Sequence, residues 1–135
     1  MVLTLESDAF ENNGVIPKKY AKEGIRELLA AIRMSGQGSF LSVLKNFGSK
    51  KPVGYLSFPL EGTTIAIDFP NKGAKTEKLI HDLYNIVISF GGRIYPAKDA
   101  LMTSDQFRSC YPLYKKFIKF RDSSIQSSMS RRYKI

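Results

Sequence analysis

Two stretches of the chain carry apolar residues at helical spacing, and both end at glycine. Between Tyr20 and Met34 the apolar positions fall on one stripe, and Ser35-Gly36 follows as a stop signal. The second stretch starts near Thr76, a suitable N-cap, and reaches about Phe90 before Gly91-Gly92. The stripes consist of Ile25, Leu28, Leu29 and Ile32, then Leu79, Ile80, Leu83, Val87 and Phe90. This pattern predicts two amphipathic helices, each with one buried side.

Alternation of apolar and polar residues predicts the strands. Residues 2–10 begin with such alternation, and Asn12-Asn13-Gly14 then has the composition of a turn. Residues 39–47 and 63–69 are the next two strands, and a short strand at 93–95 follows the second helix. In the second strand Leu41, Val43, Lys45 and Phe47 share one face, and Phe40, Ser42 and Leu44 share the other.

The order strand, helix, strand, strand, helix, strand indicates an α+β fold of the split βαβ (ferredoxin-like) type. Its sheet is antiparallel, and both main helices lie on one face. C-terminal helices at Met102–Cys110 and Tyr111–Arg121 are expected to follow, the first opened by Thr103 or Ser104. The serine-rich, basic stretch from Asp122 is expected to lie at the fringe of the domain.

This arrangement leaves the other sheet face uncovered. If Thr63, Ile65, Ile67 and Phe69 lie under the helices, the open face carries Thr64, Ala66 and Asp68, with Val43, Lys45 and Phe47 from the neighbouring strand. A face that is half apolar and half polar is typical of a surface that binds a partner.

The last predicted strand ends at Tyr95-Pro96-Ala97-Lys98-Asp99. Residues just beyond a strand end, on a loop held by rigid elements, are well placed to contact a ligand. The simpler interpretation is a solvated ion pair between Lys98 and Asp99.

The length and the net charge of the chain limit the number of domains and the class of partner that can be expected. The chain has 135 residues, which suits one domain with its own core, and its formal charge of +9 favours an acidic partner such as nucleic acid, an anionic membrane surface or a phosphorylated ligand. A generally basic surface without a specific partner explains the charge equally well.

Cys110 is the only cysteine and His81 the only histidine, so no metal site is expected, and His81 is interpreted as a surface residue. With no apolar run of membrane-spanning length, a cytoplasmic location is the default.

Five ordered segments resemble the C-terminal substrate (cap) domain of FAD-linked oxidases of the vanillyl-alcohol oxidase superfamily. The nearest branch is the one with sugar-lactone oxidases and decaprenylphosphoryl-ribose oxidase. The resemblance covers roughly Val15 to Arg132. The segments are residues 35–41 (SGQGSFL), 43–45 (VLK), 56–62 (LSFPLEG), 68–70 (DFP) and 91–99 (GGRIYPAKD).

This resemblance implies FAD as the cofactor, held by an FAD-binding domain or subunit, and a sugar-type alcohol or lactone as the substrate. Lys98 and Tyr95 would face the flavin, and a cation at Lys98 would favour the anionic reduced ring. The substrate would be contacted by Val43, Lys45, Phe47, Thr64 and Ala66. Family members associated with membranes suggest peripheral contact with a bilayer.

The sequence also departs from the family. It has no glycine-rich phosphate loop and no flavin-attachment motif, so the chain alone is expected to bind FAD weakly and to be inactive. Thr64 and Ala66 replace an asparagine and, in some relatives, a cysteine, and Ser128 replaces a common acidic residue. Residues 1–14 are an atypical N-terminal segment, 15–121 the substrate domain and 122–135 its basic, serine-rich tail, which suggests a split protein, a remnant or a fragment.

Two alternatives remain at this point. The first is a basic ferredoxin-like module that binds nucleic acid, although Thr64 and Ala66 stand where stacking aromatic residues are expected. The second is a module that self-associates through the open sheet face into a homo-oligomer.

Overall fold

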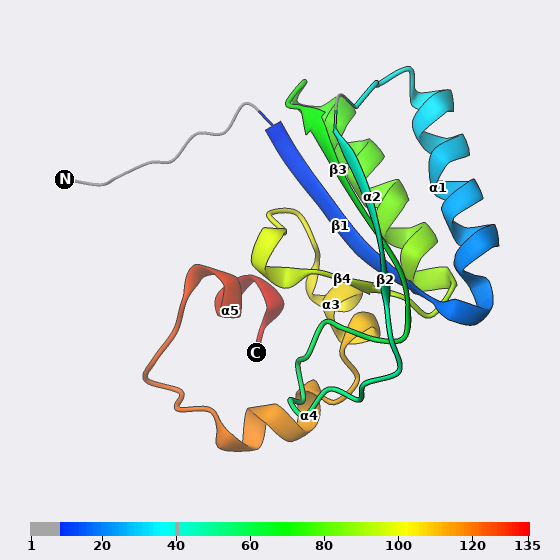
Figure 1. The fold of residues 1–135 in the computed structure, drawn as a ribbon. Helices are drawn as coiled ribbons and strands as arrows, with labels where there is room; N and C mark the ends of the chain where they lie inside the picture. Colours follow the sequence, from blue (N-terminus) through cyan, green and yellow to red (C-terminus); the bar gives the residue numbers. More distant parts are fainter. Residues whose placement is uncertain (1–8, 40) are drawn as a thin grey trace.

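The computed structural model describes residues 9–39 and 41–135. Four strands form one antiparallel sheet in the order β2-β3-β1-β4, and two long helices pack on one of its faces (Figure 1). The strands are β1 (Ala9–Pro17), β2 (Ser42–Phe47), β3 (Gly62–Pro70) and β4 (Arg93–Ile94), and the helices are α1 (Ala21–Ser35) and α2 (Ala74–Ser89). The predicted α+β, ferredoxin-like fold with its helices on one face is confirmed.

The first strand differs from its prediction. β1 runs without interruption through Asn12-Asn13-Gly14, which pair with Ile67, Ala66 and Ile65 of β3, so the predicted turn is wrong. Turn-forming residues adopt an extended conformation here because β1 lies between β3 and β4 and its backbone bonds to both. Most of the predicted strand at residues 2–10 lies outside the described residues, as does the placement of Phe40.

Both helices end as predicted, but α2 begins differently. Gly36 takes a left-handed conformation (φ 64°) after α1, and Gly91 does so (φ 71°) after α2. The N-cap of α2 is Gly73, not Thr76, which lies in the first turn and is fully buried. The Thr76 hydroxyl contacts the side-chain oxygen of Gln37 at 2.8 Å and so joins the start of α2 to the end of α1.

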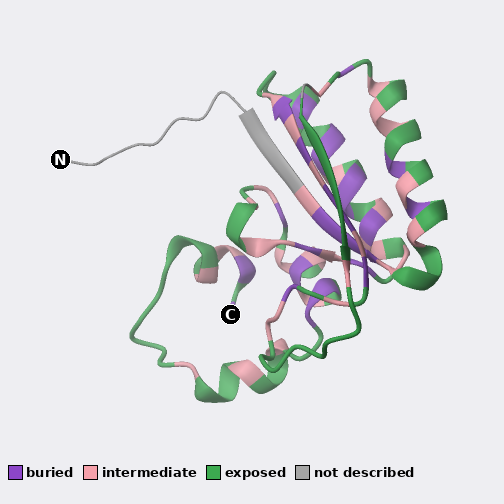
Figure 2. Cartoon of the chain, in the orientation of Figure 1, coloured by how far each residue is buried: buried purple, intermediate pink, exposed green. Residues whose placement is uncertain are grey.

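The core lies between the helices and the sheet, where Figure 2 shows the buried residues concentrated. Ile65, Ile67 and Phe69 of β3 and Ile16 of β1 are almost completely buried under the two helices. Gly24 of α1 allows a close approach, because a Cβ there would stand 2.6 Å from Cδ1 of Ile16. Leu29, assigned to the buried stripe from its spacing, instead lies at the rim and is 48% exposed.

A second layer follows β4. It consists of η2 (Pro96–Lys98), α3 (Ser104–Cys110), α4 (Tyr114–Phe117), η3 (Ile118–Phe120) and α5 (Ser128–Tyr133), while the short η1 (Lys18–Tyr20) joins β1 to α1. Thr103, one of the two predicted starting residues, caps α3 together with Gln106. The predicted helix at Tyr111–Arg121 is shorter, because Tyr111 is already the C-cap of α3.

The predicted place of the C-terminal segment at the fringe holds for residues 122–129, which are exposed, but is wrong for the end of the chain, where Tyr133 and Ile135 belong to the core. Ser127 and Ser130 form a capping box that starts α5. This helix buries Tyr133 completely, and the Tyr133 ring stacks on Phe107 with 4.4 Å between the ring centres.

Among the described residues, none of the helices has the length and apolar character needed to cross a membrane.

Candidate ligand site on the open sheet face

Strand register decides which side chains share the open face. Val43 and Asn13 both pair with Ala66, and Lys45 and Val15 both pair with Thr64. Directly paired residues point to the same side of a sheet, so all six lie on the face opposite the main helices. The face deduced from alternation is therefore present in the structure.

A cavity of about 340 Å³ opens on this face. Five of the seven residues predicted as contacts line it: Val43, Lys45, Ala66, Tyr95 and Lys98. The remaining lining residues are Asn13, Leu41 and Asp68. Leu41 and Asp68 had been placed on this face by alternation, but Asn13 was missed because its sequence context indicated a turn. The structure thus brings β1, β2, β3 and the segment after β4 together around one cavity.

The other two predicted contacts, Phe47 and Thr64, lie outside the cavity lining. The ring of Phe58 lies 6.0 Å from the ring of Phe47 and 4.8 Å from that of Tyr95, and Phe58 itself is buried. Thr64 is only 3% exposed although it faces away from the main helices. The loop that carries Phe58 therefore covers this end of the face, and the expectation of a wholly uncovered face is wrong here.

Arg93 holds this covering loop in place. Its register opposite Val15 puts it on the same face, and Nη1 of Arg93 donates hydrogen bonds to the backbone oxygens of Ser57 (2.7 Å) and Pro59 (3.3 Å). A guanidinium with several donors can satisfy two carbonyl groups at once. The covering loop is thereby tied to β4, the strand that leads directly to Tyr95 and Lys98.

The lining residues give the cavity a mixed chemical character. Val43, Ala66 and Tyr95 supply apolar surface, and Asn13 and Asp68 supply hydrogen-bonding groups. Lys45 and Lys98 add two cations. Such a set suits a ligand with an apolar, planar part and several hydroxyl or anionic groups.

Lys98 owes its position to the residue that follows it. Lys98 is exposed at the end of η2, while the side chain of Asp99 is only 1% exposed. Oδ1 of Asp99 accepts hydrogen bonds from the backbone N–H groups of Leu101 (2.9 Å) and Met102 (2.8 Å). The interpretation of Lys98 and Asp99 as a solvated pair is therefore wrong for Asp99, which fixes the loop after η2.

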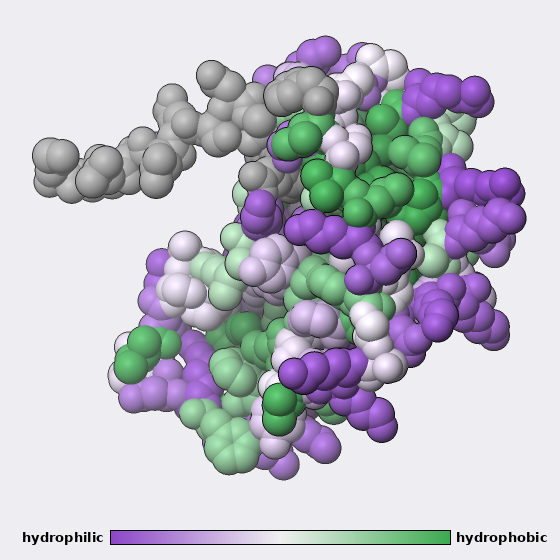
Figure 3. Space-filling model, viewed as in Figure 1, coloured by the Kyte–Doolittle hydropathy of each residue, from purple (hydrophilic) through white to green (hydrophobic). Residues whose placement is uncertain are grey.

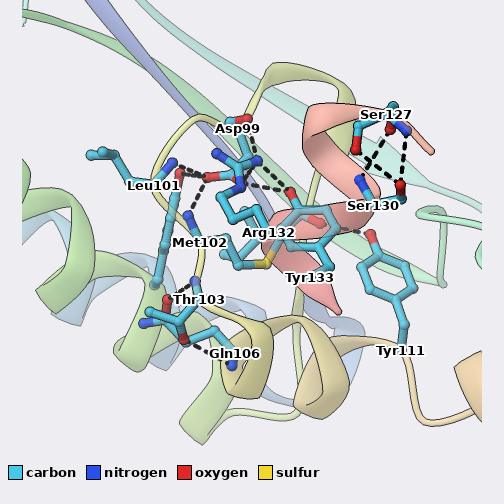
Figure 4. A network of polar contacts seen from close by, with 12 residues as sticks. Asp99, Leu101, Met102, Thr103, Gln106, Tyr111, Ser127, Ser130, Arg132 and Tyr133 are labelled. Carbon is cyan, nitrogen blue, oxygen red and sulfur yellow. Dashed lines mark hydrogen bonds and ion pairs between the residues drawn. The ribbon is translucent and has the colours of Figure 1, made fainter. Parts of the chain in front are cut away.

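Three further side chains donate to the Asp99 carboxylate, and Figure 4 labels two of them, Arg132 and Tyr133. Tyr84 of α2 donates to Oδ1 at 2.7 Å, and Tyr133 of α5 donates to Oδ2 at 2.6 Å. Arg132 donates to Oδ2 and to the backbone oxygen of Asp99, both at 3.0 Å. Burial, reinforced by the nearby Asp99 carboxylate, raises the pKa of both tyrosines above their usual range, so both stay neutral donors.

No family model matches the chain. Among curated proteins, the chain is 36% identical over 126 residues to decaprenylphosphoryl-β-D-ribose oxidase of Mycolicibacterium smegmatis, which covers 90% of this chain and 27% of the oxidase. It is also 29% identical over 105 residues to an uncharacterized protein in the mprA 5′ region of Streptomyces coelicolor, covering 78% of this chain and 28% of that protein. The chain thus spans about a quarter of the length of these relatives, and the predicted resemblance to the C-terminal part of an FAD-linked oxidase is confirmed.

Proposed function

Because this chain is homologous to one part of an FAD-linked oxidase, we propose that it is the substrate domain of an FAD-dependent oxidoreductase. In this proposal the open-face cavity forms one wall of the active site, and an FAD-binding domain or partner chain forms the other. The observation that carries the proposal is the joint presence of Lys45, Tyr95 and Lys98 in one cavity on the face opposite the main helices.

The substrate we propose is a sugar-type alcohol. A sugar has hydroxyl groups that hydrogen-bond in several directions, and Asn13, Lys45 and Asp68 offer both donors and acceptors around the cavity. The relative from M. smegmatis is named for a ribose linked to decaprenyl phosphate. A phosphate-linked sugar suits a wall that also holds two lysines, since each lysine can bind phosphate as a point charge.

The residues present fit one edge of a flavin ring. Lys98 offers an ammonium group and Tyr95 an aromatic surface, next to the apolar Val43 and Ala66. When bound, FAD would supply the hydride acceptor. Lys98 would place a positive charge where negative charge collects on the reduced ring, and a charge-assisted hydrogen bond of this kind contributes about 1.5–3 kcal/mol. The remainder of FAD would be held by the other domain.

The direct test uses the purified chain with FAD. Ligand that binds the folded form raises the melting temperature, and flavin absorbance reports its surroundings. We expect weak binding that Lys98→Ala abolishes. Lys22→Ala, which removes an exposed lysine from α1 on the other side of the sheet, is the matched control and should bind like the wild type.

A chimera tests the function itself. This chain replaces the matching segment of the M. smegmatis oxidase, and flavin bleaching is followed when the decaprenylphosphoryl sugar is added. Bleaching that is lost in the Lys98→Ala chimera, with flavin still bound, would support the proposal. The proposed roles of these side chains would be refuted by one result: folded, flavin-bound chimeras in which alanine at Lys98, Lys45 or Asp68 leaves the extent of bleaching unchanged.

A further inference from the structure

β2 is an edge strand, and among the described residues it pairs with β3 alone, because it ends the strand order β2-β3-β1-β4. Five of its six residues are exposed, and Phe47 is partly buried, so little of the strand is covered by the rest of the chain. Apart from Lys45, whose side chain lies at the cavity, β2 has none of the features that keep edge strands apart, such as a proline or a bulge. Its outer side, the β2 edge, is therefore open to another strand.

The register with β3 decides which backbone groups of β2 point to this edge. The N–H group of Asp68 donates to the carbonyl oxygen of Leu41 at 3.3 Å, and these two residues continue the register of the two strands. Hydrogen-bonded pairs recur at every second residue of an antiparallel ladder. The residues of β2 that bond to β3 are therefore Val43, Lys45 and Phe47. The N–H and C=O groups that point away from β3 belong to Ser42, Leu44 and Asn46.

Exposed apolar side chains accompany the β2 edge on both faces of the sheet. Leu44, which pairs with the buried Ile65, is 57% exposed on the helix side, and Leu41 is 52% exposed on the cavity side. Leu29 of α1, which is half exposed, lines a hollow with residues 36–38, the segment that leads toward β2. Figure 3 shows apolar side chains gathered in the upper right part of the molecule, where Figure 1 draws β2 and α1. An apolar patch beside an unpaired strand is typical of a protein contact.

From these observations we propose that the β2 edge pairs with the β2 edge of a second copy of this chain. The two strands run antiparallel and are centred on Leu44, which faces its own copy, while Ser42 faces the partner's Asn46 on each side of it. Each of these three pairs exchanges two backbone hydrogen bonds, so every outward-pointing group of the strand finds a partner. The two four-stranded sheets become one, with both open-face cavities on the same side.

The same register suits the side chains, which favours a second copy as the occupant of the edge. Leu44 packs on its own copy, Leu41 on the partner's Phe47, and Lys45 lies opposite the partner's Val43. No two lysines stand directly opposite each other, an arrangement that would be destabilising. A shift of the pair by one residue would set outward-pointing groups against groups already bonded to β3. One strand and the rim of one helix form a small interface, so the dimer should be weak and dissociate on dilution. The proposal does not depend on flavin binding.

A disulfide tests both the dimer and its register. Val43 and the partner's Lys45 form a pair without mutual hydrogen bonds, whose Cα atoms are about 4.5 Å apart, a distance that a disulfide spans. In a Cys110→Ala background, a mixture of Val43→Cys and Lys45→Cys should cross-link under mild oxidation. Either variant alone should not, because its own two cysteines are two residues out of step. An affinity tag on one variant identifies the mixed product. Equal yields in all three samples, or no cross-link in any, would overturn the proposal.

Sedimentation equilibrium measures the strength of the pairing. At about 0.5 M NaCl, which screens the net charge of +9, the mass of the full chain should rise with concentration toward that of a dimer. Leu44→Lys sets two ammonium groups opposite each other and should raise the dissociation constant at least about tenfold. The control Met34→Lys makes the same charge change at an exposed residue of α1 on the side of α2, and it should dimerise like the wild type. Equal effects of both variants would overturn the proposal. So would a monomer at every concentration, which would leave the edge to a strand of another protein.

Discussion

The hydroxyl of Tyr133 donates a 2.6 Å hydrogen bond to Oδ2 of Asp99, across 34 positions of the sequence. This bond connects α5 to the residue that directly follows Lys98. Arg132 bonds to the same carboxylate oxygen and to the Tyr133 hydroxyl (2.9 Å), so three side chains form one closed group. The position of Lys98 at the cavity therefore depends on the C-terminal helix.

Replacing the Asp99 carboxylate by an amide should be costly. Both oxygens of Asp99 accept only, so the NH₂ group of an asparagine side chain at this position would face donors whichever way it was turned. We expect Asp99→Asn to lower the free energy of unfolding by about 2–4 kcal/mol in urea denaturation. The control Asp105→Asn alters a side chain that is 91% exposed and should change stability by less than about 0.5 kcal/mol. A loss below about 1 kcal/mol for Asp99→Asn would contradict this role.

Tyr133 contributes through both its ring and its hydroxyl. Tyr133→Phe keeps the stacking on Phe107 and removes the hydroxyl, so we expect a loss of about 1–2 kcal/mol. Tyr133→Ala also removes the ring from the core and should cost about 3–5 kcal/mol. Thermal unfolding measures both. If the two variants lost the same stability, the hydroxyl would account for the whole effect and the stacking for none.

Gly24 tests how closely α1 approaches the sheet. Alanine favours a helix by about 1 kcal/mol, but here its methyl group would stand 2.6 Å from Ile16 and 3.1 Å from Phe90. We expect the clash to dominate and Gly24→Ala to be destabilising by about 1–3 kcal/mol in urea. Gly38→Ala is the matched control, because its methyl group would meet nothing within 4 Å and should be neutral or slightly stabilising. A stabilised Gly24→Ala variant would show that the helix can move away.

The buried thiol of Cys110 should make the free energy of unfolding fall at alkaline pH. Burial raises the pKa of its thiol from 9.0 to about 11, so the folded state holds this proton more tightly than the unfolded state. The stabilisation is complete below pH 9 and is lost as the pH rises toward 11, by up to about 3 kcal/mol. Cys110→Ala removes this contribution. Its free energy of unfolding, measured by urea denaturation at several pH values, should therefore fall less steeply over that interval; identical slopes would exclude a role for the thiol.

Replacing Arg93 should loosen only the loop that its side chain binds. Without its bonds to Ser57 and Pro59, the loop that covers Thr64 loses its tie to β4. We expect Arg93→Gln to speed amide hydrogen exchange in residues 54–60 by at least about tenfold, with little change in β3. Arg26→Gln on α1 serves as the control. Unchanged exchange in the loop would mean that Phe58 alone holds it.

The sequence predicted the elements whose evidence is local. Apolar spacing predicts α1, α2 and β3. The start of α3 is predicted at Thr103 or Ser104, and Thr103 is the cap, because a capping residue acts on its own helix. Alternation also placed Val43, Lys45 and Ala66 on one face, because side chains of a strand alternate strictly. These three line the cavity in the structure.

The predictions that the structure contradicts concern segments whose conformation depends on residues distant in the sequence. Asn12-Asn13-Gly14 became strand because two other strands bond to it, which no local pattern shows. The cover over Thr64 comes from Phe58, on a loop whose composition indicates only exposure. For α5 a signal did exist: Ser127 and Ser130 have capping-box spacing before an aromatic residue. The capping-box spacing was not recognised because the high serine content of the segment indicated an exposed tail.

The central position of β1 has a consequence for how the molecule folds. Its nearest partner in the sequence is Gly62, which pairs with Pro17, and its other neighbour, β4, is farther away still. Contacts between such distant segments form slowly, because a long loop must close before they are gained. We therefore expect β1 to join β3 late and β4, whose strand partner among the described residues is β1, to join with it or after it. Until then the edge of β3 that faces β1 stays open, and the β1 segment of a second molecule can pair with it and give a domain-swapped dimer at high concentration.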